Sequence, residues 1–378
     1  MTAIWSFPTR IVFGVGESRR TGEEAKALGI RRALVVTDRG VVDAGMCEGI
    51  LSSLKAAGIE VAVFSGIESN PTEANIEAGA AALEAQRADG VVCIGGGSPM
   101  DAGKLIALRA RCKLSFEELD DAIGGGQHVP DGLPPIITLP TTAGTGSEVG
   151  RAAVVTVRST NRKTVVFSPK LLARVAILDP ELTRSMPART TAATGFDALT
   201  HCVESYLALG DHPMADAIAL AGIDLIAKHL PTAVSRGDDL EARGAMMKAA
   251  MMGAVAFQKG LGACHSLAHP LSSVHGLHHG LANALCLPAV MDFNESAALE
   301  RVLHVGLLLG GEPAIGSCGT ALRKLRLELG LPGGLGEVGV GAENLPALAD
   351  QAILDACHRE NPRTCSRDDL LELYRASL

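Results

Sequence analysis

The stretch DGVVCIGGGSPMDAGK, residues 89–104, decides the fold of this chain. It begins with an apolar run that predicts a buried strand, continues with consecutive glycines, and ends with residues that favour a helix. Gly95, Gly96 and Gly97 allow the backbone to turn sharply and to approach a ligand closely. Ser98 is expected to cap the helix, whose first amide groups attract anions. Strand, glycine turn and helix together predict a site for a dinucleotide pyrophosphate.

The same alternation of strand and helix surrounds that stretch. Strand patterns occupy residues 31–40, 59–67, 89–98 and 133–142, and helix patterns occupy residues 48–58 and 72–88. Buried strands separated by helices indicate βαβ units and a parallel sheet. Ligands of such sheets bind beyond the carboxyl ends of the strands, where this chain reads TDRG, GGGSPMD and TTAGTGSE.

Two features near these strand ends bear on the ligand. The glycine turns match neither the P-loop ATPase motif nor the strict GxGxxG dinucleotide fingerprint. Asp38 follows the apolar run ALVVT. A carboxylate there can accept hydrogen bonds from a ribose diol and would repel a 2′-phosphate, which favours NAD over NADP. The alternative for Asp38 is a solvated turn residue.

Composition excludes several classes of protein. The 378 residues are 47% hydrophobic and 20% charged, which suits two folded domains and shows no signature of disorder. A net charge of −8 argues against a nucleic-acid binder. No apolar run reaches the ~20 residues of a membrane span, and the first residues do not read as a secretion signal. Nine cysteines without a CxxC pair fit reduced thiols in the cytoplasm.

The residue pattern changes from strand-like to helical after about Arg184. Long, alanine-rich segments with helical periodicity follow, at residues 190–209, 213–234 and 241–258. Prolines at positions 180 and 187 flank the change. We therefore expect an α/β dinucleotide-binding domain at residues 1–184 and an all-helical, metal-binding catalytic domain at residues 185–378.

Histidines are concentrated in GACHSLAHPLSSVHGLHHGLAN, residues 262–283, which holds five of the eleven in the chain. His265 and His269 are four residues apart and would share a helix face. Pro270 is expected to pull His269 away from regular helix. His279 lies fourteen residues after His265.

A second polar pair lies in TGFDALTHCVE, where Asp197 and His201 are also four residues apart. A carboxylate and an imidazole on an apolar helix are costly to bury unless they are paired or coordinated. One carboxylate and three imidazoles form a mixed oxygen and nitrogen set that suits Fe²⁺ or Zn²⁺. The alternative is a group of ordinary hydrogen-bonded polar residues.

Six blocks in order, over nearly the whole chain, carry a resemblance to a known family. The blocks are GGGSPMDAGK, LPTTAGTGSEV, ILDPELT, ATGFDALTHCVE, HSLAHPL and HHGLANALCLPAVMDFN. Here the sequence resembles the iron-containing (group III) alcohol dehydrogenases, and within them most resembles the 4-hydroxybutyrate dehydrogenase branch. The resemblance implies the dehydroquinate synthase-like fold, with an α/β nucleotide domain that has a parallel sheet and an all-α C-terminal domain.

The resemblance also implies the roles of individual residues. The metal ligands would be Asp197, His201, His265 and His279. His269 would lie beside them, near nicotinamide and substrate, so Asp197, His265 and His269 would carry the catalysis. The contacts to NAD would be Asp38, Asn70, Gly96, Gly97, Ser98, Asp101, Thr138, Thr141, Thr142, Ser147, Val149, Lys163, Leu182 and Cys357.

The activity so implied is the NAD(H)-dependent interconversion of a primary alcohol and its aldehyde, with Fe²⁺ or Zn²⁺ as the metal. We expect a short ω-hydroxy acid and its semialdehyde, such as 4-hydroxybutyrate and succinate semialdehyde. Lys259 and Arg151 are candidate partners for the distal carboxylate, and the alternative for each is a solvated surface cation. The family also implies a cytoplasmic homo-oligomer, commonly a dimer.

The sequence is also compatible with other functions. The same logic admits an aldehyde with a phosphonate or sulfonate in place of the carboxylate. A maleylacetate reductase is a further candidate, although the complete ligand set argues against it. A lyase like dehydroquinate synthase would need more lysines and arginines in the helical half. A nucleotide- or metal-binding protein without catalysis is the alternative outside the enzymes.

Overall fold

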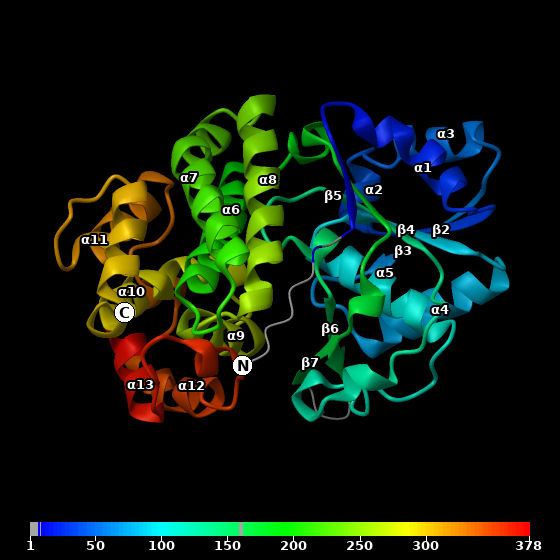
Figure 1. The fold of residues 1–378 in the computed structure, drawn as a ribbon. Coiled ribbons are helices and arrows are strands. Elements are labelled where there is room, and N and C mark those ends of the chain that lie inside the picture. Colours follow the sequence, from blue (N-terminus) through cyan, green and yellow to red (C-terminus); the bar gives the residue numbers. More distant parts are fainter. Residues whose placement is uncertain (1–6, 8, 159–161) are drawn as a thin grey trace. The chain divides into compact units, whose positions relative to one another are not determined.

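The computed structural model describes residues 7, 9–158 and 162–378 (Figure 1). Its internal contacts divide the chain into two units. We call the first the α/β unit, which comprises residues 7–142 and 146–184. The second is the helical unit, which comprises residues 143–145 and 185–378. The predicted fold class, a parallel α/β fold followed by an all-helical fold, is confirmed.

Six parallel strands form the sheet of the α/β unit, in the order β1-β8-β5-β4-β2-β3. Four of them were predicted from apolar runs, whereas β1 and β8 were not. Their bounds are β1 (Arg10–Phe13), β2 (Arg32–Asp38), β3 (Glu60–Ile67), β4 (Gly90–Gly95), β5 (Ile136–Pro140) and β8 (Val175–Leu178).

Both faces of this sheet are buried under helices. Along β2, Ala33 and Val35 face one hydrophobic core, whereas Leu34 and Val36 face the other. The first core is covered by α1 (Thr21–Ala27) and α3 (Glu48–Ala56), with α2 (Arg39–Asp43) following β2. The second is covered by α4 (Glu73–Ala85) and α5 (Gly97–Arg109), on the opposite side of the sheet (Figure 1). Burial on both faces explains why these strands read as continuous apolar runs.

The glycine turn lets α5 start close to β4. Gly95 has a φ of +148°, and a Cβ on Gly103 would lie 2.1 Å from Cys93 Sγ, so a side chain at either position would disturb the turn or the helix packing. The prediction that Ser98 caps this helix is wrong. Gly96 occupies the cap position and α5 begins at Gly97, so Ser98 lies within the first turn.

A two-stranded antiparallel hairpin, which was not predicted, follows the last polar turn. It consists of β6 (Ala152–Val157) and β7 (Arg162–Phe167). Asp101 on α5 accepts a hydrogen bond from Val154 N at 3.1 Å, and the fully buried Lys104 donates to Ala152 O at 2.8 Å. Buried charge-assisted hydrogen bonds therefore fasten the hairpin to α5.

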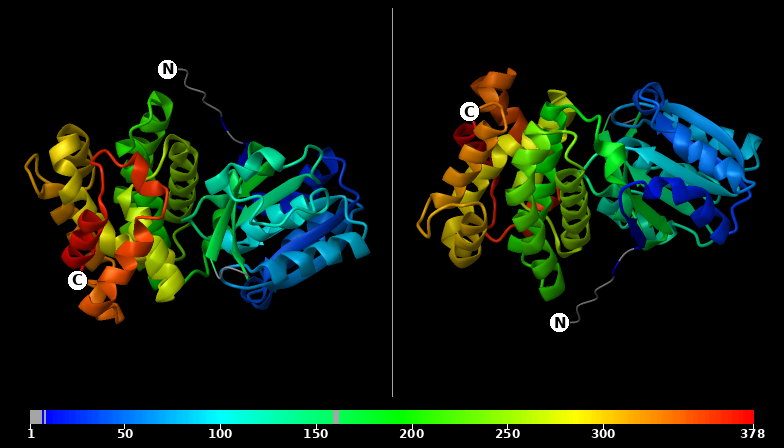
Figure 2. Two further views of the ribbon diagram at one scale, coloured as in Figure 1. Left: turned by 90° about the horizontal axis from the view of Figure 1, so that it is seen from below. Right: turned by 90° about the horizontal axis from the view of Figure 1, so that it is seen from above.

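The helical unit is built around α6 (Ala188–Leu207). The helices that pack most extensively against it are α7 (Pro213–Ser235), α8 (Leu240–Ala256) and α10 (His279–Leu308) (Figures 1 and 2). Small residues bring them close, since a Cβ on Gly195 would lie 2.3 Å from Leu230 Cδ1 and one on Gly222 would lie 2.6 Å from Cys202 Sγ. The abundance of alanine and glycine in this half reflects close helix packing.

The remaining helices are α9 (Ala263–Val274), α11 (Ser317–Glu328), α12 (Leu345–Ala352) and α13 (Arg367–Ala376). The expectation that Pro270 removes His269 from regular helix is wrong, because α9 continues through it. Proline costs one backbone hydrogen bond, but Leu267 and Leu271 on either side are fully buried and hold the segment in place.

Within the described residues, α7 alone is long and apolar enough to cross a membrane by length and composition. The sequence-based expectation missed it because Asp224 and Lys228 interrupt its apolar run. One face of α7 packs on α6 and α8, and its Asp216 forms an ion pair with Lys259.

Candidate functional site

One carboxylate and four imidazoles gather in the helical unit. Asp197 and His201 come from α6, His265 and His269 from α9, and His279 is the first residue of α10. Asp197 Oδ1 lies 3.5 Å from His279 Nε2 and 4.0 Å from His201 Nε2. The His265 ring centroid lies 4.8 Å from that of His201 and 5.4 Å from that of His279. All four residues predicted as metal ligands are therefore neighbours.

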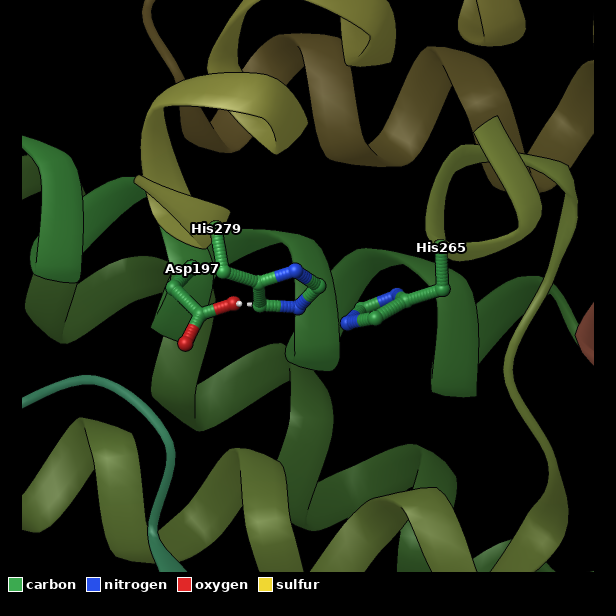
Figure 3. A group of neighbouring side chains, drawn as sticks. All are labelled: Asp197, His265 and His279. Atoms are coloured by element: carbon green, nitrogen blue, oxygen red, sulfur yellow. Dashed lines mark ion pairs between the residues drawn. The ribbon is translucent and has the colours of Figure 1, made fainter. Parts of the chain in front are cut away.

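Figure 3 shows three of them at close range. Asp197 lies against one side of the His279 ring, and His265 reaches toward that ring from the other side. The ligand atoms of these three residues lie within 4.8 Å of one another. A Cβ on Gly280 would lie 2.1 Å from the carbonyl oxygen of Ala193, so glycine at this position is what lets the start of α10 approach α6.

Glu204 orients His265, a role that sequence analysis missed. Its Oε2 lies 2.5 Å from His265 Nδ1, and its Oε1 accepts a hydrogen bond from Cys264 N at 2.6 Å. Nδ1 of His265 therefore carries the proton that faces Glu204, which leaves the lone pair on Nε2. That Nε2 is buried and has no hydrogen-bond partner among the described residues. Burial opposes a charged ring, but Glu204 raises the pKa of His265.

Asn283 orients Asp197 in the same manner, and it was also missed. Its Nδ2 donates to Asp197 Oδ1 at 2.8 Å, from a position one helical turn after His279. Burial would raise the pKa of Asp197, but the nearby imidazoles lower it below its ordinary value. Burial lowers the pKa of His201 to about 4 and that of His279 well below its ordinary value.

The donor set fits a divalent cation. The carboxylate is ionised, while His201 and His279 are neutral and offer lone pairs, and the buried Nε2 of His265 needs a partner. Three imidazoles and one carboxylate are ligands that Fe²⁺ and Zn²⁺ accept. The residues present therefore fit the metal that the sequence predicts.

His269 lies beside this set and is held by a different carboxylate. Its ring stacks on that of His279, with centroids 5.3 Å apart, and its Nδ1 lies 2.7 Å from Asp355 Oδ2. Asp355 also accepts hydrogen bonds from Ser266 Oγ and Cys357 N, both at 2.8 Å. Burial opposes its charge, but His269 and these donors lower the pKa of Asp355 well below its ordinary value. Sequence analysis did not single out Asp355.

The residues expected to bind NAD lie mostly at one edge of the sheet in the α/β unit. Parallel strands bring their carboxyl ends to the same edge. There β2 ends at Asp38, β4 ends at Gly95, and β5 ends just before Thr141. The predicted residues on or just after strand ends are Asp38, Asn70, Gly96, Gly97, Ser98, Thr141, Thr142 and Leu182. Asp38 is fixed in place because its Oδ1 accepts a hydrogen bond from Val41 N at 2.9 Å.

Other residues of that prediction lie elsewhere. Thr138 is fully buried on β5, and its hydroxyl donates a hydrogen bond to Glu148 O at 3.2 Å. Asp101 accepts a hydrogen bond from Ser147 Oγ at 2.5 Å. Val149 is buried, and burial lowers the pKa of Lys163 on β7. Cys357 belongs to the helical unit, where burial raises the pKa of its thiol well above its ordinary value.

The two candidate partners for a substrate anion differ. Lys259 is buried, forms an ion pair with Asp216, and donates to Tyr206 O at 3.0 Å. It is neither a solvated cation nor free for substrate, so the expectation that it binds the distal carboxylate is corrected. Arg151 lies just before β6 in the α/β unit and is partly buried, which lowers its pKa.

Comparisons with known proteins bear on both units. The family profile described as iron-containing alcohol dehydrogenase matches residues 8–180, and that of the C-terminal part of the Fe-containing alcohol dehydrogenase family matches residues 191–378. A 4-hydroxybutyrate dehydrogenase from Cupriavidus necator is 39% identical over 98% of each chain.

Two solved structures are similar over almost their whole length. A 1,3-propanediol oxidoreductase has a TM-score of 0.95 and 35% identity, with 100% of each chain covered. A sulfoacetaldehyde reductase from Bifidobacterium kashiwanohense, in complex with NAD⁺, has a TM-score of 0.91 and 31% identity, with 100% of this chain and 98% of that one covered.

Proposed function

The chain belongs to the iron-containing alcohol dehydrogenases, and we propose that it interconverts a short ω-hydroxy acid and its semialdehyde. The coarser activity is that of the family: a metal-dependent oxidoreductase of alcohols and aldehydes that uses NAD(H). The convergence of Asp197, His265 and His279 on one point carries the proposal that the metal acts there. We assign dinucleotide binding to residues 1–184 and metal binding to residues 185–378.

The proposed substrate class rests on the names of relatives and on one cation. One relative is a 4-hydroxybutyrate dehydrogenase and another is a sulfoacetaldehyde reductase, so both act on substrates with a terminal anion. Arg151, which is partly buried just before β6, is the predicted partner that we retain for such a group. We favour a carboxylate over a sulfonate because the carboxylate-using relative is 39% identical and the sulfonate-using relative 31%.

The geometry of each unit supports the binding of the two cofactors that we propose. The metal supplies Lewis acidity that lowers the barrier to removing the hydroxyl proton of an alcohol and polarises the carbonyl of an aldehyde. The nicotinamide supplies the hydride acceptor or donor. Asp197, His201, His265 and His279 would hold the metal, and the first amide groups of α5 would hold the pyrophosphate. Asp38 would accept hydrogen bonds from the ribose diol.

Proton transfer is the role that we assign to His269. Asp355 engages its Nδ1, which leaves Nε2 to take the alcohol proton in oxidation and to return it in reduction. The side chain of His269 is 39% exposed, so that proton can reach solvent. Glu204 and Asn283 keep His265 and Asp197 oriented throughout.

A screen of NADH oxidation tests this function on protein loaded with Fe²⁺ or with Zn²⁺. The substrates are two- to six-carbon aldehydes with and without a terminal carboxylate, together with sulfoacetaldehyde and a phosphonate analogue. We expect succinate semialdehyde to have the highest kcat/KM. Arg151→Ala should raise KM for the acidic aldehydes about tenfold and leave KM for neutral ones unchanged. A highest kcat/KM for neutral aldehydes, or an equal effect of Arg151→Ala on both kinds, would refute the substrate class.

Two further outcomes of that screen separate the alternatives. Turnover of maleylacetate in place of aldehydes would identify a maleylacetate reductase. Bound NAD(H) without turnover of any substrate would identify a binding protein. We also propose that the protein is cytoplasmic and forms a homodimer. Light scattering on the purified protein tests the dimer, which a monomeric mass would contradict.

A further inference from the structure

A second cluster of metal-binding side chains lies beside the proposed metal centre. His269, Asp355 and Cys357 place an imidazole nitrogen, a carboxylate oxygen and a thiol sulfur within 4.8 Å of one another. All three are partly buried. His269 lies on α9, Asp355 lies in the loop after α12, and Cys357 begins the short 3-10 helix Cys357–Glu360. None of them belongs to the four ligands assigned above.

The cluster is held in place before any ion binds. Asp355 is fixed by hydrogen bonds from Ser266 Oγ and from Cys357 N. Ser266 is fixed in turn, because its Oγ accepts a hydrogen bond from His358 N at 2.9 Å. The segment from Asp355 to His358 is therefore fastened to α9. A preorganised donor set loses little conformational entropy when it binds an ion.

The chemistry of the donors differs from that of the neighbouring centre. The first set has only nitrogen and oxygen donors, whereas this one includes sulfur. A thiolate with an imidazole and a carboxylate suits Zn²⁺ and Co²⁺, and it disfavours Mg²⁺ and Ca²⁺. Three protein ligands and one water would complete a tetrahedral shell.

We propose that His269, Asp355 and Cys357 form a second metal site, which binds zinc next to the cation held by Asp197 and its partner histidines. Binding forms bonds from the metal to Nδ1, a carboxylate oxygen and sulfur. The Nδ1 proton and the thiol proton pass to solvent. Zinc in this site fixes His269 and lowers turnover, a consequence that rests on the proton-transfer role given to His269 in the proposed function.

The test uses cobalt as a spectroscopic probe of sulfur ligation. Protein that carries one iron per chain is titrated with Co²⁺ without oxygen, then freed of unbound metal and analysed for both metals. We expect about one cobalt per chain with iron retained, and a near-ultraviolet charge-transfer band from sulfur to cobalt. Cys357→Ser and Asp355→Asn should each lose the band and at least tenfold in cobalt affinity while keeping their iron. Cys365→Ser, which removes a thiol eight residues away, should keep the charge-transfer band, the cobalt affinity and the iron.

Three results would overturn the second site: cobalt uptake without the band, a band that survives in Cys357→Ser, and a band that grows only as iron leaves. The turnover measurement is separate. Zinc should inhibit aldehyde reduction at the concentrations that displace cobalt from the band, and Cys357→Ser should resist, each protein being compared with its own zinc-free rate. A normal band with no zinc inhibition would refute the role of His269 while the site stands. The spectrum reports on the site even if no aldehyde is turned over.

Discussion

The candidate metal centre is built from side chains, whereas the proposed NAD site at the carboxyl edge of the sheet is built largely from backbone groups. At the metal centre, side chains from α6, α9 and α10 supply the chemistry, and carboxylate and amide side chains behind them set their orientation. At the carboxyl edge of the sheet, glycine turns and helix amide groups offer the backbone itself. Truncating a side chain should therefore impair metal binding in the first region, whereas adding a side chain should impair nucleotide binding in the second.

Removal of a ligand should have the largest effect. Asp197→Ala deletes the one carboxylate of the metal centre, so bound iron should be lost and kcat/KM should fall about 10³-fold, equivalent to several kcal/mol. Metal analysis and NADH oxidation measure the two quantities on the same sample. Full activity without bound metal would refute the assignment of the centre.

Loss of an orienting carboxylate should have a smaller effect. Glu204→Gln keeps the size of the side chain but weakens its hold on His265 Nδ1, and we expect metal affinity to fall 10- to 100-fold. Competition with a chelator measures this affinity. Ser205→Ala is the matched control on α6, because its hydroxyl bonds only the carbonyl oxygen of His201 among the contacts described. If both variants bind metal equally, Glu204 does not position the ligand.

An added methyl group tests the proposed NAD site at the carboxyl edge of the sheet. A Cβ on Gly96 would meet Thr142 at 3.4 Å, an ordinary contact, so Gly96→Ala should fold normally and raise the Kd for NADH about tenfold. Gly103→Ala is the matched variant, because its Cβ would overlap Cys93 Sγ. It should lower the Tm by several degrees. Fluorescence titration measures the Kd for NADH of each variant, and thermal unfolding measures its Tm. Unchanged NADH binding in Gly96→Ala would refute the pyrophosphate site.

The smallest effect concerns the stability of the α/β unit at alkaline pH. Burial raises the pKa of Glu148 to about 7. A carboxyl group whose pKa rises on folding contributes stability below its unfolded pKa, and this contribution is lost as pH rises through the folded value. Glu148→Gln stays neutral, so its Tm relative to wild type should be a few degrees higher at pH 8 than at pH 5. Thermal scans at both pH values measure the difference, and an equal difference would contradict the prediction.

Local spacing was sufficient to single out the proposed ligands, which the structure brings together, but not the residues that orient them. Asp197 and His201 were found because a spacing of four residues places two polar groups on one face of an apolar helix. Glu204 and Asn283 lie within the same quoted motifs, yet nothing in spacing separates a carboxylate that orients a ligand from one that faces solvent. Asp355 acts on His269 from 86 residues away, a distance that no local pattern reports.

The errors in the fold have similar causes. β1 and β8 have four residues each, too few for a clear apolar run. The hairpin of β6 and β7 lacks a turn signature such as Asn-Gly. Lys259 was assigned to the substrate because its partner Asp216 lies 43 residues earlier in the chain, on α7. The missed strands β1 and β8 are short and the partner of Lys259 is distant in sequence, so tertiary packing outweighs local preference at these places.

Residues 143–145 group with the helical unit although they lie between two strands of the α/β unit. A Cβ on Gly144 would lie 2.8 Å from Thr194 Cβ, so this tripeptide packs closely against α6, one turn before Asp197. A gene fragment that encodes only residues 185–378 would therefore lack a tripeptide that packs against its own first helix. An exchange of the two halves at Arg184 would separate this tripeptide from the helix against which it packs.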